Sequence, residues 1–497
     1  MKKHYVPDFL RKIALVLLAF FPIALSLFFQ IVSIINTWEL LRLFQFASLI
    51  VVFFAPMLVV FINKSVRKEI KKYNEETLFW VIVLAFILRI ILVQVISTNF
   101  VSDFEDVHSF ASDIYFGNTL ANLSKYPNIP YSLHLNMPSF VLSIVYKLFG
   151  PSTNVAKLFM VLLGVITTFL IYLNGKEISN ETVGLLSAFL FAILPSTICY
   201  SGTLDTVYLA FPPLLLATLL YIRSSKNNDS NLPSSVIYFS LIGILIGITD
   251  WFRPVGIILI IALIISLLIY KIKEWKNYKL LIIIGIVLLS YTGTTNLAAQ
   301  ISKNIFQTNI LSSSQRIGEY LLKGLNPISK GRVTTEDYDI AVNAYARFNG
   351  DSFETQKYLV NLAFSRLDKE GSIELFKSKI DLIWASHDAL FDYSLIGSND
   401  DELVNLLRDF ETLLWVIITV FMFFNVVFAI KENPSPATFT MQLFILGFAL
   451  LLLFMEVQNR YVAIVIPFSI LLSVSGLDTV LKKIKYNENI VRILVKK

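Results

Sequence analysis

Residues 78–98 read LFWVIVLAFILRIILVQVIST, an almost unbroken apolar run with a single charged side chain, Arg89. A helix needs roughly 20 apolar residues to cross the hydrocarbon core of a bilayer, so this stretch predicts a transmembrane helix. Arg89 lies in the middle of the run, where charge is costly. We therefore expect its side chain to face the interior of a helix bundle.

The rest of the chain repeats this pattern. Of its 497 residues, 56% are hydrophobic and 16% are charged, whereas soluble domains are usually about one quarter charged. Prolines 195, 212 and 254 are expected to break helices near their ends. The predicted fold is an all-α polytopic membrane protein with about twelve transmembrane helices, at 12–35, 43–63, 78–98, 154–173, 183–199, 204–222, 235–250, 254–270, 279–298, 410–430, 437–455 and 459–476.

Loop charges predict the topology. Segment 64–77 holds five Lys and Arg residues, whereas 99–137 holds four acidic residues and one Lys. Lys and Arg accumulate in cytoplasmic loops, so both termini are expected in the cytoplasm and the acidic loop outside. Residues 138–150 are apolar but only 13 long, and counting them as a span would place the basic segment 271–278 outside. We interpret 138–150 as a helix lying on the outer membrane surface.

The same patterns divide the chain into four parts. Two extra N-terminal transmembrane helices are expected in 1–77, and a transmembrane core in 78–299 that includes the outer acidic loop 99–153. Residues 300–409 are polar with apolar residues at helical spacing, so they predict a mainly helical insert on the outer side. Residues 410–497 are expected to hold the last transmembrane helices and a basic cytoplasmic tail.

Several functional classes lack a signal. The single cysteine, Cys199, leaves no intramolecular disulfide and no cysteine-based zinc site. The sequence has no P-loop and no dinucleotide-binding fingerprint. Its basic residues form no stripe suited to nucleic acid, so no nucleic-acid partner is expected.

The first outer loop reads TNFVSDFEDVHSFASDIYFGN over 98–118. Ser102 and Glu105 have capping-box spacing, which predicts a helix beginning at Ser102. Asp103 and Asp106 would then share one face of that helix, three residues apart. Acidic residues favour the first turn of any helix, but this turn follows a membrane span directly and would lie at the depth of a lipid phosphate.

Further charged residues lie at the predicted outer ends of the spans. Arginine suits phosphate because its planar guanidinium donates several hydrogen bonds, and a carboxylate can act as a general base or bind a divalent cation. Each residue alone would commonly be an interfacial anchor. Together they predict a site for an anionic, lipid-linked substrate, made by Asp103, Asp106, Lys157, Asp205, Arg253, Glu456, Arg460 and Tyr461.

The order of several short motifs resembles the GT-C superfamily of membrane glycosyltransferases, in the branch of protein O-mannosyltransferases and lipid A aminoarabinose transferases. The resemblance covers about 78–299 and 437–476, and the family's adjacent Asp-Glu pair is replaced here by Asp103-Phe-Glu105-Asp106. It rests on SDFED (102–106), Pro138 before a short helix ending in LFG, Lys157, NGKEISN (174–180), Pro195 to Asp205, Arg253-Pro254, and Glu456 to Pro467. Within 300–409, GLNPISKGRV and TTEDYD resemble loops of related bacterial proteins.

The resemblance implies an inverting glycosyltransferase in a bacterial plasma membrane. It would move a sugar from a polyprenyl-phosphate donor to a glycan, lipid or protein acceptor on the outer face. Asp103, Asp106 and Asp205 would be the catalytic carboxylates, with Asp103 as the base. Asp103 and Asp106 would also be the ligands of any divalent cation. Lys157, Arg253, Glu456, Arg460 and Tyr461 would bind substrate.

Two alternatives stay open at this point. A transporter or flippase for a lipid-linked saccharide would need polar residues at mid-membrane and paired, broken helices. A non-catalytic scaffold that binds a partner through 300–409 would leave the outer acids dispersed. A large separation between Asp103, Asp205 and Arg460 would favour the scaffold.

Overall fold

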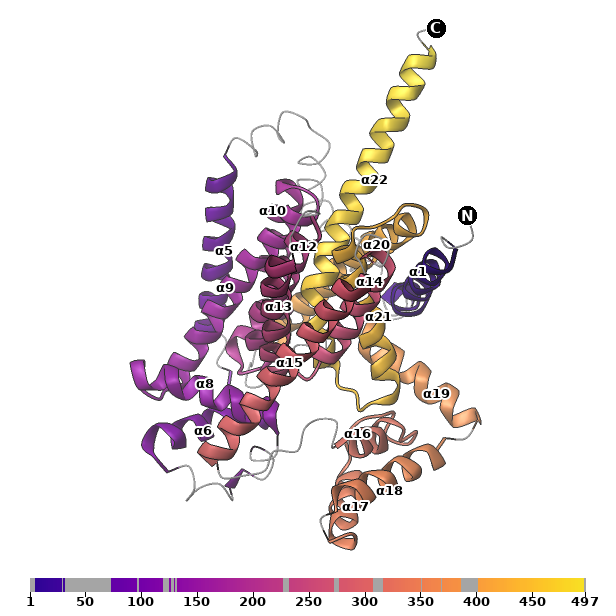
Figure 1. The fold of residues 1–497 in the computed structure, drawn as a ribbon. Coiled ribbons are helices and arrows are strands. Elements are labelled where there is room, and N and C mark those ends of the chain that lie inside the picture. Colours follow the sequence, from indigo (N-terminus) through magenta and orange to yellow (C-terminus); the bar gives the residue numbers. More distant parts are fainter. Residues whose placement is uncertain are drawn as a thin grey trace.

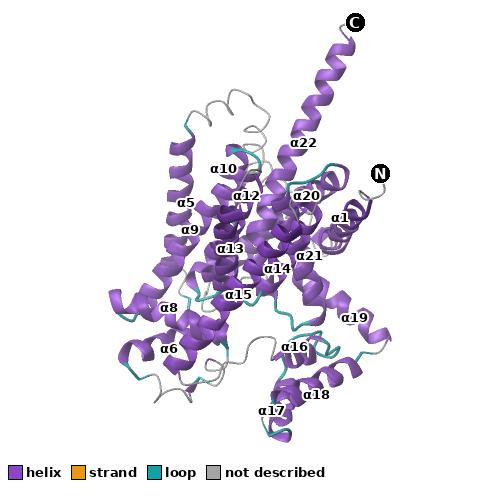
Figure 2. Cartoon of the chain, viewed as in Figure 1, coloured by secondary structure: helices purple, strands orange, loops and turns teal. Residues whose placement is uncertain are grey.

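The computed structural model describes residues 5–28, 30–31, 73–95, 98–118, 125–126, 129, 132–226, 232–271, 277–306, 316–349, 351–367, 369–385 and 401–495. Within these ranges all regular structure is helical and no strand occurs, as Figure 2 shows. The prediction of an all-α polytopic membrane protein is therefore confirmed. The predicted span 43–63 lies outside the described residues.

Nine described helices are long and apolar enough to cross a membrane. The first combines α1 (Tyr5–Leu18) with the π-helix η2 (Ala19–Ala24), and the last combines the 3₁₀-helix η9 (Asn459–Val465) with α22 (Ile466–Val495). The other seven are α5 (Asn74–Val95), α9 (Thr153–Ile178), α12 (Val207–Lys226), α13 (Leu232–Phe252), α15 (Asn277–Phe306), α20 (Asp401–Lys431) and α21 (Pro436–Phe454).

Two predicted spans differ from straight, full-length helices. The predicted span 183–199 is bent by 65° at Pro195, between α10 (Glu181–Ile193) and α11 (Pro195–Cys199). The side chain of Glu411 accepts a hydrogen bond of 2.9 Å from the Ser196 amide, so a carboxyl group caps the new helix start. The predicted span 254–270 is α14 (Gly256–Lys271), whose 16 residues are short for a full crossing.

The expected breaks at proline are thus only partly correct. Pro195 breaks its helix and Pro254 lies in the turn between α13 and α14, but Pro212 lies inside the continuous helix α12. Transmembrane helices tolerate an internal proline where surrounding packing compensates for the lost backbone bond. Arg89 is fully buried, as predicted, and donates to the carbonyl oxygen of Ala85 at 3.0 Å.

The helices outside the membrane bundle gather at one end of it (Figure 1). There α6 (Asp103–Phe116) packs against α8 (Leu133–Phe149), which begins five residues before the predicted interfacial helix 138–150. The helices of the insert lie near the same end, whereas the far end of α22 points away from it. This arrangement is the one that the predicted topology requires, and the assignment of sides stays a prediction.

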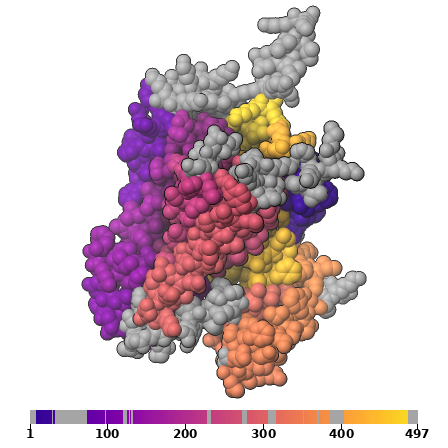
Figure 3. Space-filling view, in the orientation of Figure 1, coloured from indigo at the N-terminus to yellow at the C-terminus, as the bar shows by residue number. Residues whose placement is uncertain are grey.

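The insert holds α16 (Ile317–Gly324), α17 (Thr335–Arg347), α18 (Ser352–Ser365), α19 (Lys369–Ile380) and the π-turn η7 (Asp381–Ala385). Its first three helices enclose a small core that includes Leu322, Leu325 and Leu359. Figure 3 shows the insert as an orange lobe against the yellow C-terminal segment. Both ends of the predicted insert 300–409 belong to helices of the membrane bundle. Helix α15 continues to Phe306, and α20 already begins at Asp401.

Candidate active site

The turn between α21 and α22 contacts the acidic loop directly. Arg460, in η9, donates from Nη2 to Oδ2 of Asp103 at 3.0 Å, joining the first outer loop to the last span. The Arg460 side chain is 9% exposed and that of Asp103 is 30% exposed. The guanidinium also lies 5.1 Å from the ring centre of Phe104. A charge-assisted hydrogen bond of this kind fixes the position of the Arg460 guanidinium at the end of the bundle.

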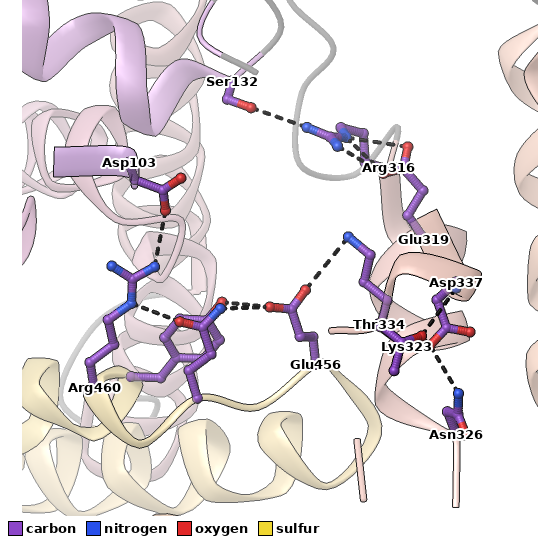
Figure 4. Close-up of polar contacts among 12 residues, drawn as sticks. Asp103, Ser132, Arg316, Glu319, Lys323, Asn326, Thr334, Asp337, Glu456 and Arg460 are labelled. Carbon is purple, nitrogen blue, oxygen red and sulfur yellow. Dashed lines mark hydrogen bonds and ion pairs between the residues drawn. The ribbon is translucent and has the colours of Figure 1, made fainter. Parts of the chain in front are cut away.

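A chain of hydrogen bonds extends from Arg460 along the same turn. Arg460 Nε donates to Gln458 Oε1 at 2.8 Å, and Gln458 Nε2 donates to Glu456 Oε1 at 3.0 Å. The Tyr461 hydroxyl donates to the same Glu456 oxygen at 3.0 Å. In Figure 4 the Glu456 carboxylate lies between Arg460 and Lys323, whose Nζ is 3.7 Å from Glu456 Oε2.

A second acid–base pair lies beside the first. Asp205 is fully buried before α12 and accepts from Arg253 Nη2 at 2.5 Å and from the Val207 amide at 3.0 Å, both through Oδ1. Its Oδ2 has no hydrogen-bond partner among the described residues. Arg253 also lies 5.9 Å from the ring centre of Tyr461, and Asp205 exerts a favourable charge interaction on Arg460. The two pairs therefore belong to one cluster.

His134 is a member of this cluster that sequence reasoning missed. It lies in the first turn of α8 and feels the charges of Arg253, Asp103, Arg316 and Arg460. Burial, followed by the positive charge of Arg253, lowers the pKa of His134 to about 4. Its imidazole is neutral at physiological pH and can donate or accept a hydrogen bond. The weak sequence signal was a histidine four residues before Pro138.

The insert contributes residues that sequence reasoning also missed. Arg316 donates to Ser132 Oγ at 3.1 Å and pairs with Glu319 at 2.8 Å, as Figure 4 shows. Hydrogen bonding and the charge of Glu319 outweigh burial and raise the pKa of Arg316, which stays charged. Lys323 approaches Glu456 from the same helix. Arg316 and Glu319 are only three residues apart, but the contacts of Arg316 with Ser132 and of Lys323 with Glu456 join distant parts of the chain, so no local pattern predicts them.

The local structure of the acidic motif differs from the predicted capping box. Ser102 has φ +55° and its side chain does not cap α6, so the predicted capping box is wrong; the Ser102 carbonyl oxygen instead accepts from the Glu105 amide at 3.0 Å. The helix begins at Asp103 nonetheless, and Glu105 is exposed. The carboxylate of Asp106 makes no hydrogen bond to another described residue, although its amide donates to the Ser102 carbonyl oxygen at 3.1 Å. Burial, with the charges of Asp103 and Glu105, raises the pKa of Asp106 above its usual value.

Lys157 points away from the arginine cluster. Its Nζ donates to the carbonyl oxygen of Thr98 at 2.7 Å and lies 5.7 Å from the ring centre of Phe100. The lysine therefore holds the chain where α5 passes into the acidic loop. Of the other predicted site residues, Asp103, Asp205, Arg253, Glu456, Arg460 and Tyr461 form one network, and Asp106 adjoins it through its charge.

The predicted metal ligands form only part of a coordination shell. No group of three or more His, Cys, Asp or Glu side chains suited to a metal occurs within the described ranges. Asp103 and Asp106 are close enough for their charges to interact, and Mg²⁺ commonly binds one or two carboxylates together with substrate phosphates. These two residues fit a cation only if the substrate and water supply the remaining ligands.

Comparisons with known proteins extend this description. Residues 134–292 match the family described as dolichyl-phosphate-mannose-protein mannosyltransferase. Oligosaccharyltransferase AglB from Archaeoglobus fulgidus, solved with an inhibitory peptide and a dolichol-phosphate, is 14% identical with a TM-score of 0.46, covering 85% of this chain and 52% of that one. ArnT from Cupriavidus metallidurans, bound to undecaprenyl phosphate, is 10% identical with a TM-score of 0.36, covering 81% and 77%.

This chain spans about half the length of the archaeal oligosaccharyltransferase that it matches. No curated protein matches the sequence. The family match over 134–292 includes His134, Lys157, Asp205 and Arg253. It confirms the resemblance to the GT-C superfamily and to its protein O-mannosyltransferase branch. The chain is thus a multi-pass membrane protein similar to membrane glycosyltransferases.

Proposed function

We propose that this protein transfers a sugar from a polyprenyl-phosphate donor to a hydroxyl acceptor at the outer face of the membrane, with inversion. The observation that carries the proposal is the contact of Asp103 with Arg460, beside the pair of Asp205 and Arg253. This cluster combines carboxylates with arginines at the end of a membrane bundle. A lipid-linked phosphate would meet the protein at the same depth.

The arginines suit the leaving group. In the transfer, the acceptor oxygen forms a bond to the anomeric carbon while the bond from that carbon to the phosphate oxygen breaks. The bonding electron pair leaves with the phosphate, whose added negative charge Arg460 and Arg253 would stabilise. Tyr461 and Glu456 hold the turn that carries Arg460, and His134 adds a neutral hydrogen-bonding group beside it.

The acceptor proton needs a base, which we assign to Asp103. In the structure the Asp103 carboxylate accepts a hydrogen bond from Arg460, which occupies one of its oxygens. A donor phosphate would compete for the same guanidinium and release Asp103 as it binds. Asp106 is the alternative base, because its own pKa is already raised.

A divalent cation could assist at the same place. Asp103 and Asp106 would be its protein ligands, and a bound cation would supply further positive charge to the leaving phosphate. The arginines perform this task from the protein side whether or not a cation takes part. Transfer measured with and without a chelator, followed by addition of Mg²⁺, Mn²⁺ or Zn²⁺, decides the requirement.

The competing functions fit this geometry less well. A scaffold would leave Asp103 and Arg460 apart, whereas they are 3.0 Å apart. A flippase needs its polar residues at mid-membrane, whereas this cluster lies in turns and helix ends at one end of the bundle among the described residues. The neighbours solved with dolichol-phosphate and undecaprenyl phosphate suggest which lipid phosphates to use in the assay.

The deciding experiment uses the purified full chain in liposomes with polyprenyl-phosphate sugars that carry different labelled sugars. Candidate glycan, lipid and peptide acceptors are added on the outside. We expect one label to move to one acceptor class with an inverted anomeric configuration, and Asp103→Asn to abolish it. Label that crosses the bilayer still attached to its carrier would establish a flippase and overturn the proposal.

A further inference from the structure

The turn that carries the site residues is held from the opposite side by the insert. Lys379, in α19, is fully buried and donates from Nζ to the carbonyl oxygens of Leu453 at 2.8 Å and Met455 at 2.7 Å. It also contacts the carbonyl oxygen of Leu452 at 3.3 Å. All three carbonyl groups belong to the end of α21 or to its cap residue. An ammonium group has three donors, and here each meets an oxygen.

These contacts provide hydrogen-bond donors for carbonyl groups at the end of α21. The last four carbonyl groups of a helix lack partners within the helix, and this end also carries partial negative charge. A buried lysine satisfies both requirements at the residue where the chain leaves α21 for the site. Burial lowers the pKa of Lys379 to about 7, while Glu456 favours its charged form.

Two backbone hydrogen bonds continue the contact beyond the helix end. The Glu456 amide donates to the carbonyl oxygen of Tyr320 at 3.0 Å, and the Val457 amide donates to that of Gly331 at 2.9 Å. Both acceptors belong to the insert. The residues that follow in the chain are Gln458 and Arg460, so the insert fixes the segment that leads into the phosphate-binding arginine.

The insert lies so close to the turn after α21 that only glycine fits at positions 324 and 331. A Cβ atom on Gly324 would lie 2.2 Å from the Phe454 carbonyl oxygen. A Cβ atom on Gly331, which has φ +79°, would lie 2.2 Å from Lys379 Cε. Glycine at both positions lets α16 and the following turn lie directly on the backbone of 454–457. The insert and the turn therefore fit as one unit.

We propose that Lys379 is a positioning residue for donor binding, and that the insert serves the site by fixing the turn that presents Glu456, Gln458 and Arg460. This inference rests on the proposed function, in which Arg460 binds the donor phosphate. It assigns a role to 316–385 that a mere connection between α15 and α20 would not have. The side chain of Lys379 acts through the backbone and does not touch substrate.

The test compares Lys379→Met with Lys377→Met in the full-length protein. Methionine keeps an unbranched side chain one atom shorter than that of lysine but cannot donate hydrogen bonds, and Lys377 is exposed on the same helix. Hydrogen exchange at the amides of Glu456 and Val457 measures how often their hydrogen bonds to the insert open, and this measurement does not depend on activity. Binding of polyprenyl phosphate and the separate KM values for donor and acceptor report the site.

We expect Lys379→Met to speed exchange at both amides and to weaken donor binding and raise donor KM by roughly tenfold, with acceptor KM unchanged. In an Arg460→Lys background the same substitution should have little further effect on donor KM, because residues acting through one contact are not additive. Lys377→Met should behave as wild type. Equal losses in the donor and acceptor KM values, or additive losses in the double variant, would overturn the positioning role.

If Lys379→Met does not fold, Lys379→Gln replaces it in the same measurements; its amide nitrogen lies one atom short of the Lys379 Nζ position and has two donors in place of three, so exchange at both amides should still be faster than in wild type. Unchanged exchange at Glu456 and Val457 in a folded Lys379 variant would overturn the inference by itself. A wild-type protein that binds no polyprenyl phosphate would instead refute the proposed function. The exchange measurement separates the two failures.

Discussion

The two acid–arginine pairs of the cluster differ in a way that separates binding from structure. Asp103 and Arg460 meet across 357 residues of sequence, and the Asp103 side chain is 30% exposed. Asp205 and Arg253 are 48 residues apart, and Asp205 has no exposed surface. A ligand can reach and open the first pair at small cost. Opening the second pair would leave a buried charge alone, which is far more costly.

The first prediction concerns Asp103 at the accessible pair. Asp103→Asn should lower the rate of transfer by about 10²–10⁴-fold, because asparagine cannot accept the acceptor proton. Membrane expression and Tm should stay near wild type, since Asp103 is partly solvated. Transfer is measured with a labelled donor at saturating acceptor. A near-normal rate in this variant, with a large loss in Asp106→Asn, would move the base to Asp106.

At the buried pair we expect the main loss to be in stability, whereas at the accessible pair it is in the rate of transfer. Asp205→Asn leaves Arg253 without its counter-charge, which should cost about 3–5 kcal/mol of stability. We expect low yield of folded protein and a reduced Tm in detergent, as measured by thermal unfolding of the purified variant. Replacing both partners together, by combining Asp205→Asn with Arg253→Met, should restore part of the stability. A stable, inactive single variant would show that Asp205 acts in catalysis instead.

A conservative change at the accessible pair should affect donor binding. Arg460→Lys keeps the charge but loses the planar fork of donors that suits both Asp103 and a phosphate. We expect donor KM to rise by roughly tenfold while acceptor KM and Tm change little. Steady-state kinetics with varied donor tests this. Donor KM and turnover both at wild-type values would make Arg460 an anchor only.

The neutral histidine predicts a pH dependence of stability. The folded pKa of His134, about 4, lies below its unfolded value of about 6.5. The unfolded state therefore binds more protons between these values, so stability is full above pH 6.5 and falls as the pH drops toward 4. His134→Gln should flatten the change in Tm between pH 4.5 and 7. An unchanged slope would exclude His134 as its source.

The smallest effect is expected at the exposed acid of the motif. Glu105 makes no cap and points into solvent, so Glu105→Gln should leave transfer within about twofold of wild type and change stability by less than about 0.5 kcal/mol. The same transfer assay and thermal unfolding apply. A loss of transfer comparable to that of Asp103→Asn would show that Glu105 is also needed for transfer and that the assignment of the base to Asp103 is wrong.

Much of the fold follows from local sequence. Apolar runs such as 78–98 predict spans because the hydrocarbon thickness sets a minimum helix length, and Pro195 predicts a break because it lacks an amide hydrogen. The exact count of spans does not follow, because α14 is too short to be judged by length and α10 and α11 bend. The predicted Ser102 cap is absent: Ser102 has φ +55°, whereas a capping residue typically has extended backbone, and residue spacing alone does not specify that dihedral angle.

For the candidate site, the sequence was enough to predict which types of residue take part and that they lie at one end of the bundle. Asp103, Asp205, Arg253 and Arg460 could be chosen because several acids and arginines gather at the predicted ends of spans on one side, and that combination suits a lipid-linked phosphate. Their partners could not be chosen, since the meeting of Arg316 with Ser132 depends on how the insert folds back. The contact of Lys157 with the carbonyl oxygen of Thr98 could not be predicted for the same reason, because a position at a span start does not determine the direction of the side chain.

The sequence separations within the cluster also set an order of assembly. At about 5–20 residues per second of synthesis, Arg253 follows Asp205 within roughly 2–10 s, whereas Arg460 follows Asp103 only after roughly 20–70 s. A nascent chain can therefore close its buried pair early, while the acidic loop waits for the final membrane segment. A chain truncated before η9 would insert most of its helices and still lack Arg460 from the candidate site. The contact of Asp103 with Arg460 can therefore form only after η9 has been synthesised.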